Sequence, residues 1–569
     1  MNIATLRQQY KNLELTPKTM IDNVLARIAA NKDSNIWIHL LPQEELYAYA
    51  DRLAGQSPAS LPLYGIPFAI KDNIDLAGAP TTAACPDYRY IPEQSAFVVQ
   101  RLIEAGAIPI GKTNLDQFAT GLVGVRSPYG TARNPYSNGH IPGGSSSGSA
   151  VAVATGEVCF ALGTDTAGSG RVPAAFCNLF GVKPTRGLIS TGGVVPACRS
   201  LDCVSIFAQD AADAALVLEI AQGYDPFDPF ARPIGKGTGI DGYSFTFGVP
   251  GPGELEFFGN SDYEQLFHQA VARLEQLGGR KREIDFHPFL EAARLLYEGP
   301  WVAERYAALQ AFIEAKPAAF FPVTHEIISK GINPTAVDAF KAMYRLQALR
   351  QATAAVWDDI GLLVTPTAGT IYTVAEVAAD PIRLNSNLGY YTNFMNLLDL
   401  AALAVPAGFT RAGLPFGITL AAPAFSDSFL LRVGERFSHH DGGQRELVAV
   451  CGAHLRGLPL NRQLLELGGS FVREARTAPH YRLFALDTTP PKPGLLRSAQ
   501  GGAPIDLEIW ELPAAGLGRF LAAIPAPLGL GKVELEDGGR VTGFLVEAAA
   551  VEQAQEITAF GGWKRYLEG

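Results

Sequence analysis

The sequence predicts an α/β protein with a large mixed β-sheet covered by helices on both faces, followed by a small α+β domain. Strand-like and helix-like segments alternate over about the first 440 of the 569 residues, which favours such a layered sheet. From residue 481 on, short strands separated by turn signals indicate a second domain. A stretch punctuated by glycine and proline follows His439. It predicts a first domain at residues 1–440, a linker at 441–467 and a C-terminal domain at 468–569.

The composition is that of a globular chain with a large core, since 47% of the residues are hydrophobic and 18% charged. A net charge of −10 without a run of Lys or Arg argues against nucleic acid and anionic membranes as partners. No apolar stretch is long enough to span a bilayer, and the N-terminus lacks a signal-peptide pattern. The six cysteines form no CxxC pair and the nine histidines are scattered. We therefore expect a cytoplasmic protein with no metal site and no cofactor.

The first segments along the chain supply scaffold and one notable lysine. Thr16 and Pro17 precede an apolar-periodic run, which predicts a capped helix with proline at its first position. Residues 68–74 predict a buried strand that carries Lys71 among isoleucines. Burial would lower the pKa of Lys71 toward the neutral amine that a general base requires. The alternative is a lysine that extends its amine to solvent.

Residues 106–113 match the phosphate-loop pattern GxxxxGK[ST], but their context argues against nucleotide binding. Residues 97–105 predict a helix that ends at Gly106, and residues 107–110 predict a strand. No glycine-rich loop is therefore left between a strand and a helix. The next segment, residues 114–130, predicts a helix start that runs into a glycine-broken loop. This loop either lines a pocket or is an ordinary connection.

Two serine-bearing loops in residues 143–171 form the part around which the rest of the chain is organised. A Gly/Ser loop at 143–148 leads into a helix of small residues at 149–155, a strand at 158–162 and a second loop at 163–171. Glycines let consecutive backbone N–H groups point into one concavity beside a serine hydroxyl. This is the geometry of a nucleophile next to an oxyanion hole. A Gly/Ser loop taken alone is more often a flexible turn.

The remaining segments predict further strands and covering helices. Tyr297 and Arg305 lie on either side of Gly299 and Pro300, which break the helical pattern of residues 290–313. On the sequence pattern alone, both residues have ordinary surface or packing roles. The other expected elements are strands at 243–250, 361–367 and within 399–421, a helix at 263–277, and C-terminal strands at 481–486, 505–511, 531–535 and 541–546.

Three motifs together resemble the amidase signature family. They are Lys71 within PFAIKDN at residues 67–73, the loop PGGSSSGS at 142–149 and the loop GTDTAGSGR at 163–171. The resemblance spans about residues 1–440 and implies the amidase-signature fold and a hydrolase of linear amides. The chain departs from the family at Ala167, where glycine is usual, and this departure narrows the allowed backbone geometry.

The resemblance implies a Ser-cisSer-Lys triad. Ser169 would be the nucleophile that forms an acyl-enzyme, and Ser145, preceded by a cis peptide at Gly144, would relay the proton. Neutral Lys71 would act as base and then as acid. The oxyanion hole would consist of the backbone N–H groups of Thr166, Ala167, Gly168 and Ser169.

Within the family, residues 119–129 and 393–401 and the additional C-terminal domain resemble the allophanate hydrolases. This likeness implies cleavage of the terminal amide of allophanate (urea-1-carboxylate) with release of ammonia, in urea degradation. Tyr297, Arg305 and Gly124 would bind the substrate, because a small anion is distinguished from neutral amides by a bidentate cation and a hydroxyl. We also expect a homodimer and a functional link to urea carboxylase.

The C-terminal domain resembles that of allophanate hydrolases, which looks like a γ-glutamyl cyclotransferase fold. A decarboxylation is associated with this domain in some relatives, and His480 is the residue that would take part in it. A structural or dimer-forming role is the alternative. For the whole chain, the alternatives are another small-amide amidase, the glutamine-hydrolysing subunit of a tRNA-dependent amidotransferase, and a non-catalytic binding protein on an amidase scaffold.

Overall fold

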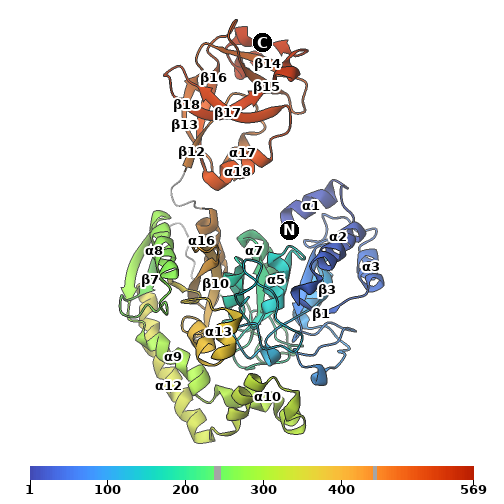
Figure 1. The fold of residues 1–569 in the computed structure, drawn as a ribbon, viewed down its shortest axis with the longest axis vertical. Helices are drawn as coiled ribbons and strands as arrows, with labels where there is room; N and C mark the ends of the chain where they lie inside the picture. Colours follow the sequence, from blue (N-terminus) through green and yellow to red (C-terminus); the bar gives the residue numbers. More distant parts are fainter. Residues whose placement is uncertain (236–244, 440–444, 569) are drawn as a thin grey trace. The chain divides into compact units, whose positions relative to one another are not determined.

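The computed structural model describes residues 1–235, 245–439 and 445–568. These residues form two compact units, Met1–Ser438 and His439–Gly569 (Figure 1). The first unit has one sheet and the second has two, and each unit has its own hydrophobic core. Among the helices of the described residues, none combines the length and the apolar character that a bilayer span needs.

The first unit is built on a sheet of 11 strands that mixes parallel and antiparallel neighbours. In its first half β2 runs parallel to both β3 and β4, whereas β6 runs antiparallel to β4 and β5. The predicted large mixed sheet is therefore confirmed. In spatial order the strands are β1 (Trp37–Leu40), β3 (Ile108–Thr113), β2 (Pro67–Lys71), β4 (Phe160–Asp165), β6 (Cys203–Ala208), β5 (Phe180–Lys183), β10 (Leu400–Phe409), β11 (Pro415–Pro423), β9 (Leu362–Pro366), β7 (Phe245–Pro250) and β8 (Gly279–Ile284).

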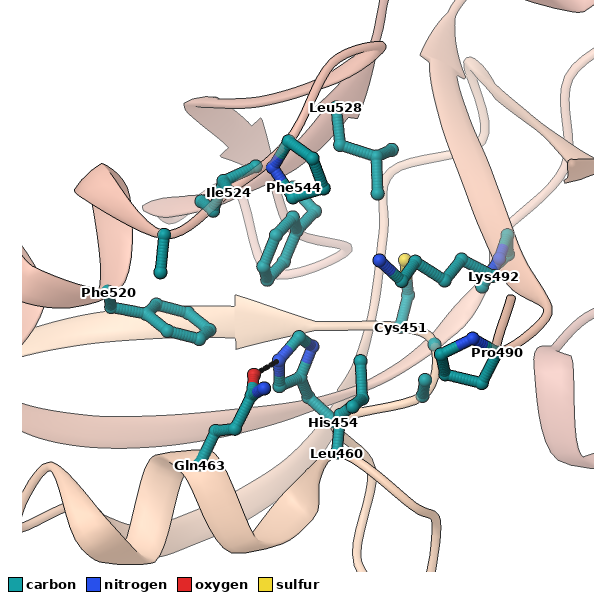
Figure 2. Close-up of a pocket in the computed structure, with 15 residues that line it drawn as sticks. Cys451, His454, Leu460, Gln463, Pro490, Lys492, Phe520, Ile524, Leu528 and Phe544 are labelled. Atoms are coloured by element: carbon teal, nitrogen blue, oxygen red, sulfur yellow. Dashed lines mark hydrogen bonds between the residues drawn. The ribbon is translucent and has the colours of Figure 1, made fainter. Parts of the chain in front are cut away.

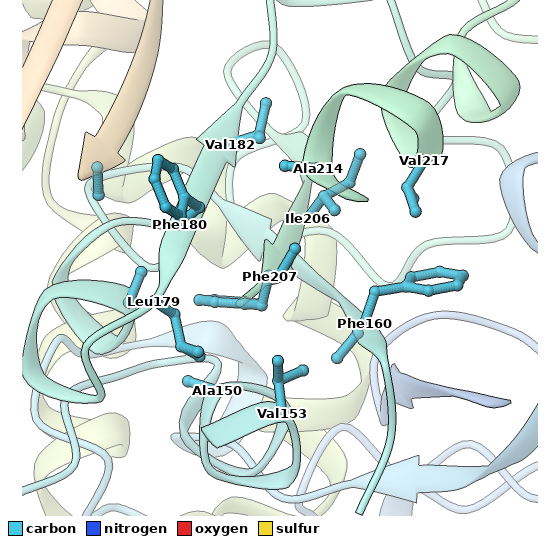
Figure 3. Packing of buried hydrophobic residues seen from close by; sticks show 14 of the residues in the cluster. Ala150, Val153, Phe160, Leu179, Phe180, Val182, Ile206, Phe207, Ala214 and Val217 are labelled. Carbon is cyan, nitrogen blue, oxygen red and sulfur yellow. The ribbon is translucent and has the colours of Figure 1, made fainter. Parts of the chain in front are cut away.

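Helices cover both faces of this sheet, as the sequence predicts. Adjacent residues of a strand point to opposite faces, and on β6 Ile206 lies next to Ala214 of α7 (Ala211–Ala221), whereas Phe207 extends to the side of α5 (Ser147–Ala154) (Figure 3). All three of these side chains are fully buried. Because α5 follows the first Gly/Ser loop directly, its packing against the sheet fixes where that loop lies.

The helices of the first unit begin and end largely where the sequence predicts. Thr16 caps α2 and accepts a hydrogen bond from the backbone of Thr19, with Pro17 at the first helical position. The pattern at residues 290–313 is broken at Gly299 and Pro300, as predicted. The helices are α1 (Ile3–Lys11), α2 (Pro17–Ala30), α3 (Gln43–Arg52), α4 (Phe97–Glu104), α6 (Val172–Phe176), α8 (Ser261–Gln276), α9 (His287–Glu298), α10 (Trp301–Ala315), α11 (Pro322–Ser329), α12 (Ala336–Ala354), α13 (Val374–Ala379), α14 (Arg383–Leu388), α15 (Phe394–Leu397) and α16 (Asp427–His439).

The GxxxxGKT segment is scaffold, as the sequence predicts. Lys112 belongs to strand β3, where it is fully buried and lies 3.2 Å from a carboxylate oxygen of Asp72. Several boundaries differ from the predictions, and the strand predicted at 68–74 ends at Lys71. Residues 163–165 end strand β4, so the second serine-bearing loop begins at Thr166. The first two residues of the strand predicted at 243–250 lie outside the described residues, and β7 begins at Phe245.

The second unit is a small α+β domain with one sheet of five strands and one of three. The predicted linker at 441–467 is wrong over most of its length. It contains β12 (Arg445–Val450), the middle strand of the larger sheet, and helix α17 (Asn461–Glu466). The other elements of this unit are β13 (Ser470–Arg476), β14 (Tyr481–Leu486), β15 (Lys492–Arg497), β16 (Asp506–Pro513), α18 (Ala514–Ala522), β17 (Leu528–Glu534), β18 (Arg540–Val546), β19 (Gln555–Glu556) and α19 (Trp563–Glu568).

Candidate active site

The structure brings Lys71 and Ser145 into direct contact. Lys71 is the last residue of β2, and its Nζ lies 2.7 Å from Oγ of Ser145. The same nitrogen lies 2.7 Å from Oγ1 of Thr164 on the neighbouring strand β4. All three side chains are buried. Two parallel strands and the first Gly/Ser loop thus converge on a single amine.

The surroundings of Lys71 favour its neutral form. Burial lowers the pKa of Lys71 to about 7, and the nearby charge of Arg305 acts in the same direction. The carboxylates of Asp116, Asp202 and Asp165 oppose this shift but do not cancel it. A substantial share of the amine is therefore unprotonated near neutral pH, as a general base requires.

Close backbone packing sets the position of Ser145. The Gly144–Ser145 peptide bond is cis, as the family resemblance implies. The N–H of Gly144 donates to the carbonyl of Leu122 at 2.8 Å, and the carbonyl of Ser145 accepts from the N–H of Asp116 at 3.0 Å. A Cβ atom on Gly144 would lie 2.2 Å from a carboxylate oxygen of Asp116, so only glycine fits at this position.

Ser169 lies in the second loop, beside a turn of the segment that follows β3. Its hydroxyl donates to the carbonyl of Gly121 at 3.4 Å, and its side chain is 4% exposed. Within the described part of the chain, this carbonyl is the one hydrogen-bond partner of the Ser169 side chain. For Ser145 to take its proton, the Ser169 hydroxyl would have to turn from Gly121 toward Ser145.

The backbone of the second loop is shaped by Asp165. Its carboxylate accepts from the N–H of Gly168 at 2.9 Å and from the N–H of Gly170 at 3.0 Å. The N–H of Gly168 is therefore occupied, and its predicted place in the oxyanion hole is wrong for this conformation. The other three predicted donors, the backbone N–H groups of Thr166, Ala167 and Ser169, have no acceptor among the described residues.

A buried ion pair holds Asp165 itself. Nε of Arg171 lies 2.9 Å from the carboxylate, and both side chains are fully buried. Burial alone would raise the pKa of Asp165, but the charge and hydrogen bonds of Arg171 outweigh it and hold the pKa below its usual value. The carboxylate stays ionised, so it can accept from the loop over a wide pH range.

Arg305 is a buried cation whose charge reaches the carboxylate of Asp202, where it opposes the rise in the Asp202 pKa that burial causes. It is 2% exposed, and no carboxylate of the described residues lies within 4 Å of its guanidinium. The guanidinium lies 5.6 Å from the centre of the Tyr297 ring and donates to Oγ1 of Thr120 at 3.3 Å. Its Nε is buried with no hydrogen-bond partner. Since Thr120 precedes the Gly121 that accepts from Ser169, the cation lies close to the predicted nucleophile.

The other two predicted site residues are Gly124, in the first unit, and His480, in the second. The N–H of Gly124 donates to Asp116 at 2.9 Å, and a Cβ there would lie 2.5 Å from the carbonyl of Gly143. Gly124 therefore borders the loop that carries Ser145. His480 belongs to the second unit, where its Nε2 lies 3.7 Å from Glu534.

Several side chains that organise this site were not predicted from the sequence. Thr164 contacts Lys71, and Asp165 with Arg171 shapes the second loop. Asp116 accepts from the backbone of Gly124 and Arg126. The available signal was an aspartate and an arginine at the two ends of a loop otherwise rich in glycine and small residues.

The chain matches two known protein families over most of its length. The amidase family model matches residues 19–431, and the model for the allophanate hydrolase C-terminal domain matches residues 446–568. A solved Kluyveromyces lactis allophanate hydrolase is 41% identical with a TM-score of 0.73, covering 99% of this chain and 98% of that chain.

Two curated relatives differ in how much of their length is matched. The urea amidolyase of Saccharomyces cerevisiae is 43% identical over 94% of this chain, but this covers 31% of the relative. The chain thus spans about a third of the length of the curated urea amidolyases that it matches. One subunit of the glutamyl-tRNA(Gln) amidotransferase of Cyanothece sp. is 32% identical, covering 76% of this chain and 96% of the relative.

The fold, the buried lysine and serine, and these matches define the class of the protein as a hydrolase that acts on amides. Within this class, the chain belongs to the amidase family and carries in addition an allophanate hydrolase C-terminal domain.

Proposed function

We propose that this chain cleaves the terminal amide of allophanate and releases ammonia, with Ser169 as nucleophile, Ser145 as proton relay and Lys71 as base. In this proposal residues 1–439 catalyse the reaction. The relatives named allophanate hydrolase and urea amidolyase support the choice of substrate.

The observation that carries the proposal is the burial of Arg305 with no carboxylate of the described residues within 4 Å of its guanidinium. A buried guanidinium with no carboxylate in direct contact is costly unless a ligand contacts and neutralises it. Allophanate carries one carboxylate at the end opposite to its amide, and arginine binds a carboxylate through two parallel hydrogen bonds. With Arg305 on the carboxylate, the Thr120–Gly121 segment keeps the other end of a short substrate near Ser169.

The proton path begins at Lys71. The neutral amine takes a proton from Ser145 while Ser145 takes one from Ser169, whose oxygen attacks the amide carbon. The free N–H groups of Thr166, Ala167 and Ser169 bind the negative oxygen that forms, and each such donor contributes about 3 kcal/mol in comparable enzymes. The protonated lysine then returns the proton to the leaving nitrogen, ammonia departs, and water hydrolyses the acyl-enzyme.

The same proposal gives the chain a place in urea degradation. The urea amidolyase relatives support a functional link between this reaction and a urea carboxylase. A cytoplasmic homodimer, and a role for His480 in a later step, complete the proposal.

The test is the effect of Arg305→Met on two substrates. We expect KM for allophanate to rise by about a hundredfold or more, because the carboxylate loses a charged, bidentate partner. KM for a neutral amide of similar size should change by about threefold or less. Ammonia release is the readout, and Arg383→Met, at an exposed arginine, is the matched control.

An equal rise in KM for both substrates would contradict the proposed binding of the carboxylate by Arg305, while leaving the proposed triad in place. Ser169→Ala tests the triad separately, since it should abolish ammonia release from both substrates.

A second candidate function is glutamine hydrolysis for a tRNA-dependent amidotransferase, which the match to the Cyanothece protein supports. That role does not account for the second unit. Ammonia release from glutamine but not from allophanate by the purified chain would favour this alternative.

A further inference from the structure

One loop, residues 116–126, contacts the segments that carry both serines of the proposed triad. The carbonyl of Gly121 accepts from the hydroxyl of Ser169 at 3.4 Å. The carbonyl of Leu122 accepts from the N–H of Gly144 at 2.8 Å, one residue before the relay serine. A side chain that holds this loop in shape therefore acts on the spacing of the two hydroxyls.

Backbone contacts close the loop at its two ends. The N–H of Gln117 donates to the carbonyl of Arg126 at 2.7 Å, and the carboxylate of Asp116 accepts from the N–H of Arg126 at 2.9 Å. These contacts fix the ends of the loop. The turn at residues 120–122, which carries the two carbonyls, needs a support of its own.

The side chain of Arg126 supplies this support. It is 1% exposed, and its two terminal nitrogens donate to the carbonyl of Thr120 at 3.0 Å and to the carbonyl of Pro381 at 2.6 Å. Pro381 lies between α13 and α14 along the chain, so the guanidinium ties the turn to a separate segment. Two donors in one rigid plane fix the direction of their acceptors, which a single-point cation does not.

Helix α14 holds the same turn through a second contact. The side-chain oxygen of Asn385 accepts from the N–H of Leu122 at 2.8 Å. The peptide group before Gly121 is thus held through its carbonyl by Arg126, and the peptide group after it through its N–H by Asn385. The carbonyl of Gly121, which contacts Ser169, belongs to the second of these fixed groups.

Arg126 lies near the cation that is proposed to bind the substrate, but the two arginines have different contacts. Arg305 donates to the hydroxyl of Thr120, whereas Arg126 donates to the carbonyl of the same residue. Burial lowers the pKa of Arg126, the charge of Asp116 opposes this shift, and the charge of Arg305 adds to it. Arg126 is bound to two backbone carbonyls, which assigns it to the loop.

These contacts all lie within the first unit. The second unit has a cavity with Phe520 and Phe544 in its walls (Figure 2), and none of the residues that line it takes part in them. Measurements of amide cleavage on the full chain therefore test the Arg126 contacts through the first unit.

We propose that Arg126 is a positioning residue for amide cleavage. Its guanidinium holds the turn at residues 120–122, and this turn keeps Ser169 and Ser145 at the separation across which the Ser169 hydroxyl turns. Arg126 itself touches no reacting atom. The inference rests on the proposed triad, because it concerns the spacing of the two serines. Loss of the guanidinium misplaces the nucleophile without removing it, which slows the cleavage of every amide alike.

The test compares Arg126→Met and Arg126→Lys in the full chain, on allophanate and on a neutral amide of similar size. We expect Arg126→Met to lower kcat/KM by about tenfold to a hundredfold, with the two substrates agreeing within about threefold. Arg126→Lys should stay within about threefold of Arg126→Met, because one ammonium nitrogen does not replace two nitrogens spaced across a guanidinium. Arg101→Met is the matched control and should leave kcat/KM unchanged, since Arg101 also donates to a backbone carbonyl, that of Ile220, outside this loop.

A second readout follows the nucleophile without any amide. The rate at which a neutral fluorophosphonate labels Ser169, measured by intact mass, should fall by a similar factor in both Arg126 variants. Thermal unfolding shows whether each variant is folded, and if Arg126→Met is not, Arg126→Lys alone decides. A lower unfolding temperature with unchanged kcat/KM and labelling would show a purely structural role and overturn the proposal.

Two other results would also overturn it. A loss confined to allophanate would assign Arg126 to binding of the substrate carboxylate, and full activity of Arg126→Lys would show that its charge alone matters. Failure of the triad is recognised separately, because Ser169→Ala would then still release ammonia, and this result would overturn both proposals.

Discussion

The proton affinity of Lys71 is set by two opposing effects. Burial disfavours the ammonium form, whereas Asp116, Asp202 and Asp165 favour it. The balance leaves the pKa at about 7, lower than the ordinary value of 10.5. A lysine at its ordinary pKa would be almost entirely protonated at neutral pH and unable to accept a proton from Ser145.

This balance predicts the pH dependence of the reaction. In the proposed mechanism the neutral amine is the active form, and this form prevails above the pKa of Lys71. We therefore expect kcat/KM to rise with pH, level off above about 7, and fall roughly tenfold for each pH unit below it. Steady-state ammonia release between pH 5 and 9 measures the profile. An acidic limb centred near 10 would show that Lys71 is charged in the free enzyme and would rule out its assignment as the base.

Thr164 affects the orientation and the pKa of the Lys71 amine, because its hydroxyl is one of two groups among the described residues within hydrogen-bond distance of that amine. Thr164→Val keeps the shape of the side chain but removes this partner. We expect kcat/KM at its plateau to fall by roughly tenfold to a hundredfold, because the amine loses its orientation toward Ser145. The acidic limb should move to lower pH, since a hydrogen bond to the charged form is lost.

Thr164→Ser is the control for this prediction, because it keeps the hydroxyl and should retain most of the activity. An unchanged acidic limb in Thr164→Val would indicate that Thr164 only fills space. The pH profile separates these two roles, which the rate alone would not.

At the scale of elements, the site depends on how closely α5 approaches the segments beside it. Gly148 in this helix donates its N–H to the carbonyl of Asn114 at 3.0 Å. A Cβ atom on Gly148 would lie 2.5 Å from the carbonyl oxygen of Ile36 and 2.6 Å from the nitrogen of Asn114. Both contacts are with backbone atoms, which cannot rotate away.

Gly148→Ala is therefore expected to destabilise the first unit by about 1–3 kcal/mol, because the clash outweighs the helix propensity gained. The matched control is Gly518→Ala in α18, where an added Cβ meets nothing within 4 Å. That change should stabilise the second unit by up to about 1 kcal/mol. Calorimetric unfolding of the full chain reports both units. If Gly148→Ala left the free energy of unfolding unchanged, α5 would be able to shift without destabilising the first unit.

For the molecule as a whole, the sequence was most informative where a signal is local. The capped helix at Pro17, the buried strand that carries Lys71 and the break before Trp301 are all visible in short windows, although that strand was predicted to extend to Ile74. The contacts of Asp165 with Arg171 and of Lys71 with Thr164 were not predicted, because they depend on how strands and loops converge in space. The positions of the triad residues came from the family resemblance.

The error in the predicted linker has the same cause as the missed contacts, because the partners of β12 are distant in the sequence. β12 has six residues, and its partners β16 and β18 lie far along the chain. Glycines at 442, 443 and 452 flank it, and such punctuation is typical of a connection. A short strand whose partners are distant carries little local signal, so the boundary was predicted too late in the chain.

The corrected boundary yields a prediction about truncation. A chain that ends at residue 439 contains the whole first unit and should release ammonia from allophanate at a rate within about threefold of the full chain, since the groups assigned to this reaction lie before that point. A chain that ends at residue 460 keeps β12 but loses both strands that flank it, which exposes Val448 and Val450 and two unpaired edges. Such an edge pairs with other chains.

We expect the shorter chain to elute from a sizing column as a discrete species and the longer one to aggregate. Ammonia release and column elution measure the two outcomes on the same preparations, with the full chain as reference. An inactive but folded chain of residues 1–439 would show that the second unit is needed for the first reaction. Equal solubility of both truncated chains would mean that β12 does not depend on its partners, which its place in the middle of the sheet makes physically unfavourable.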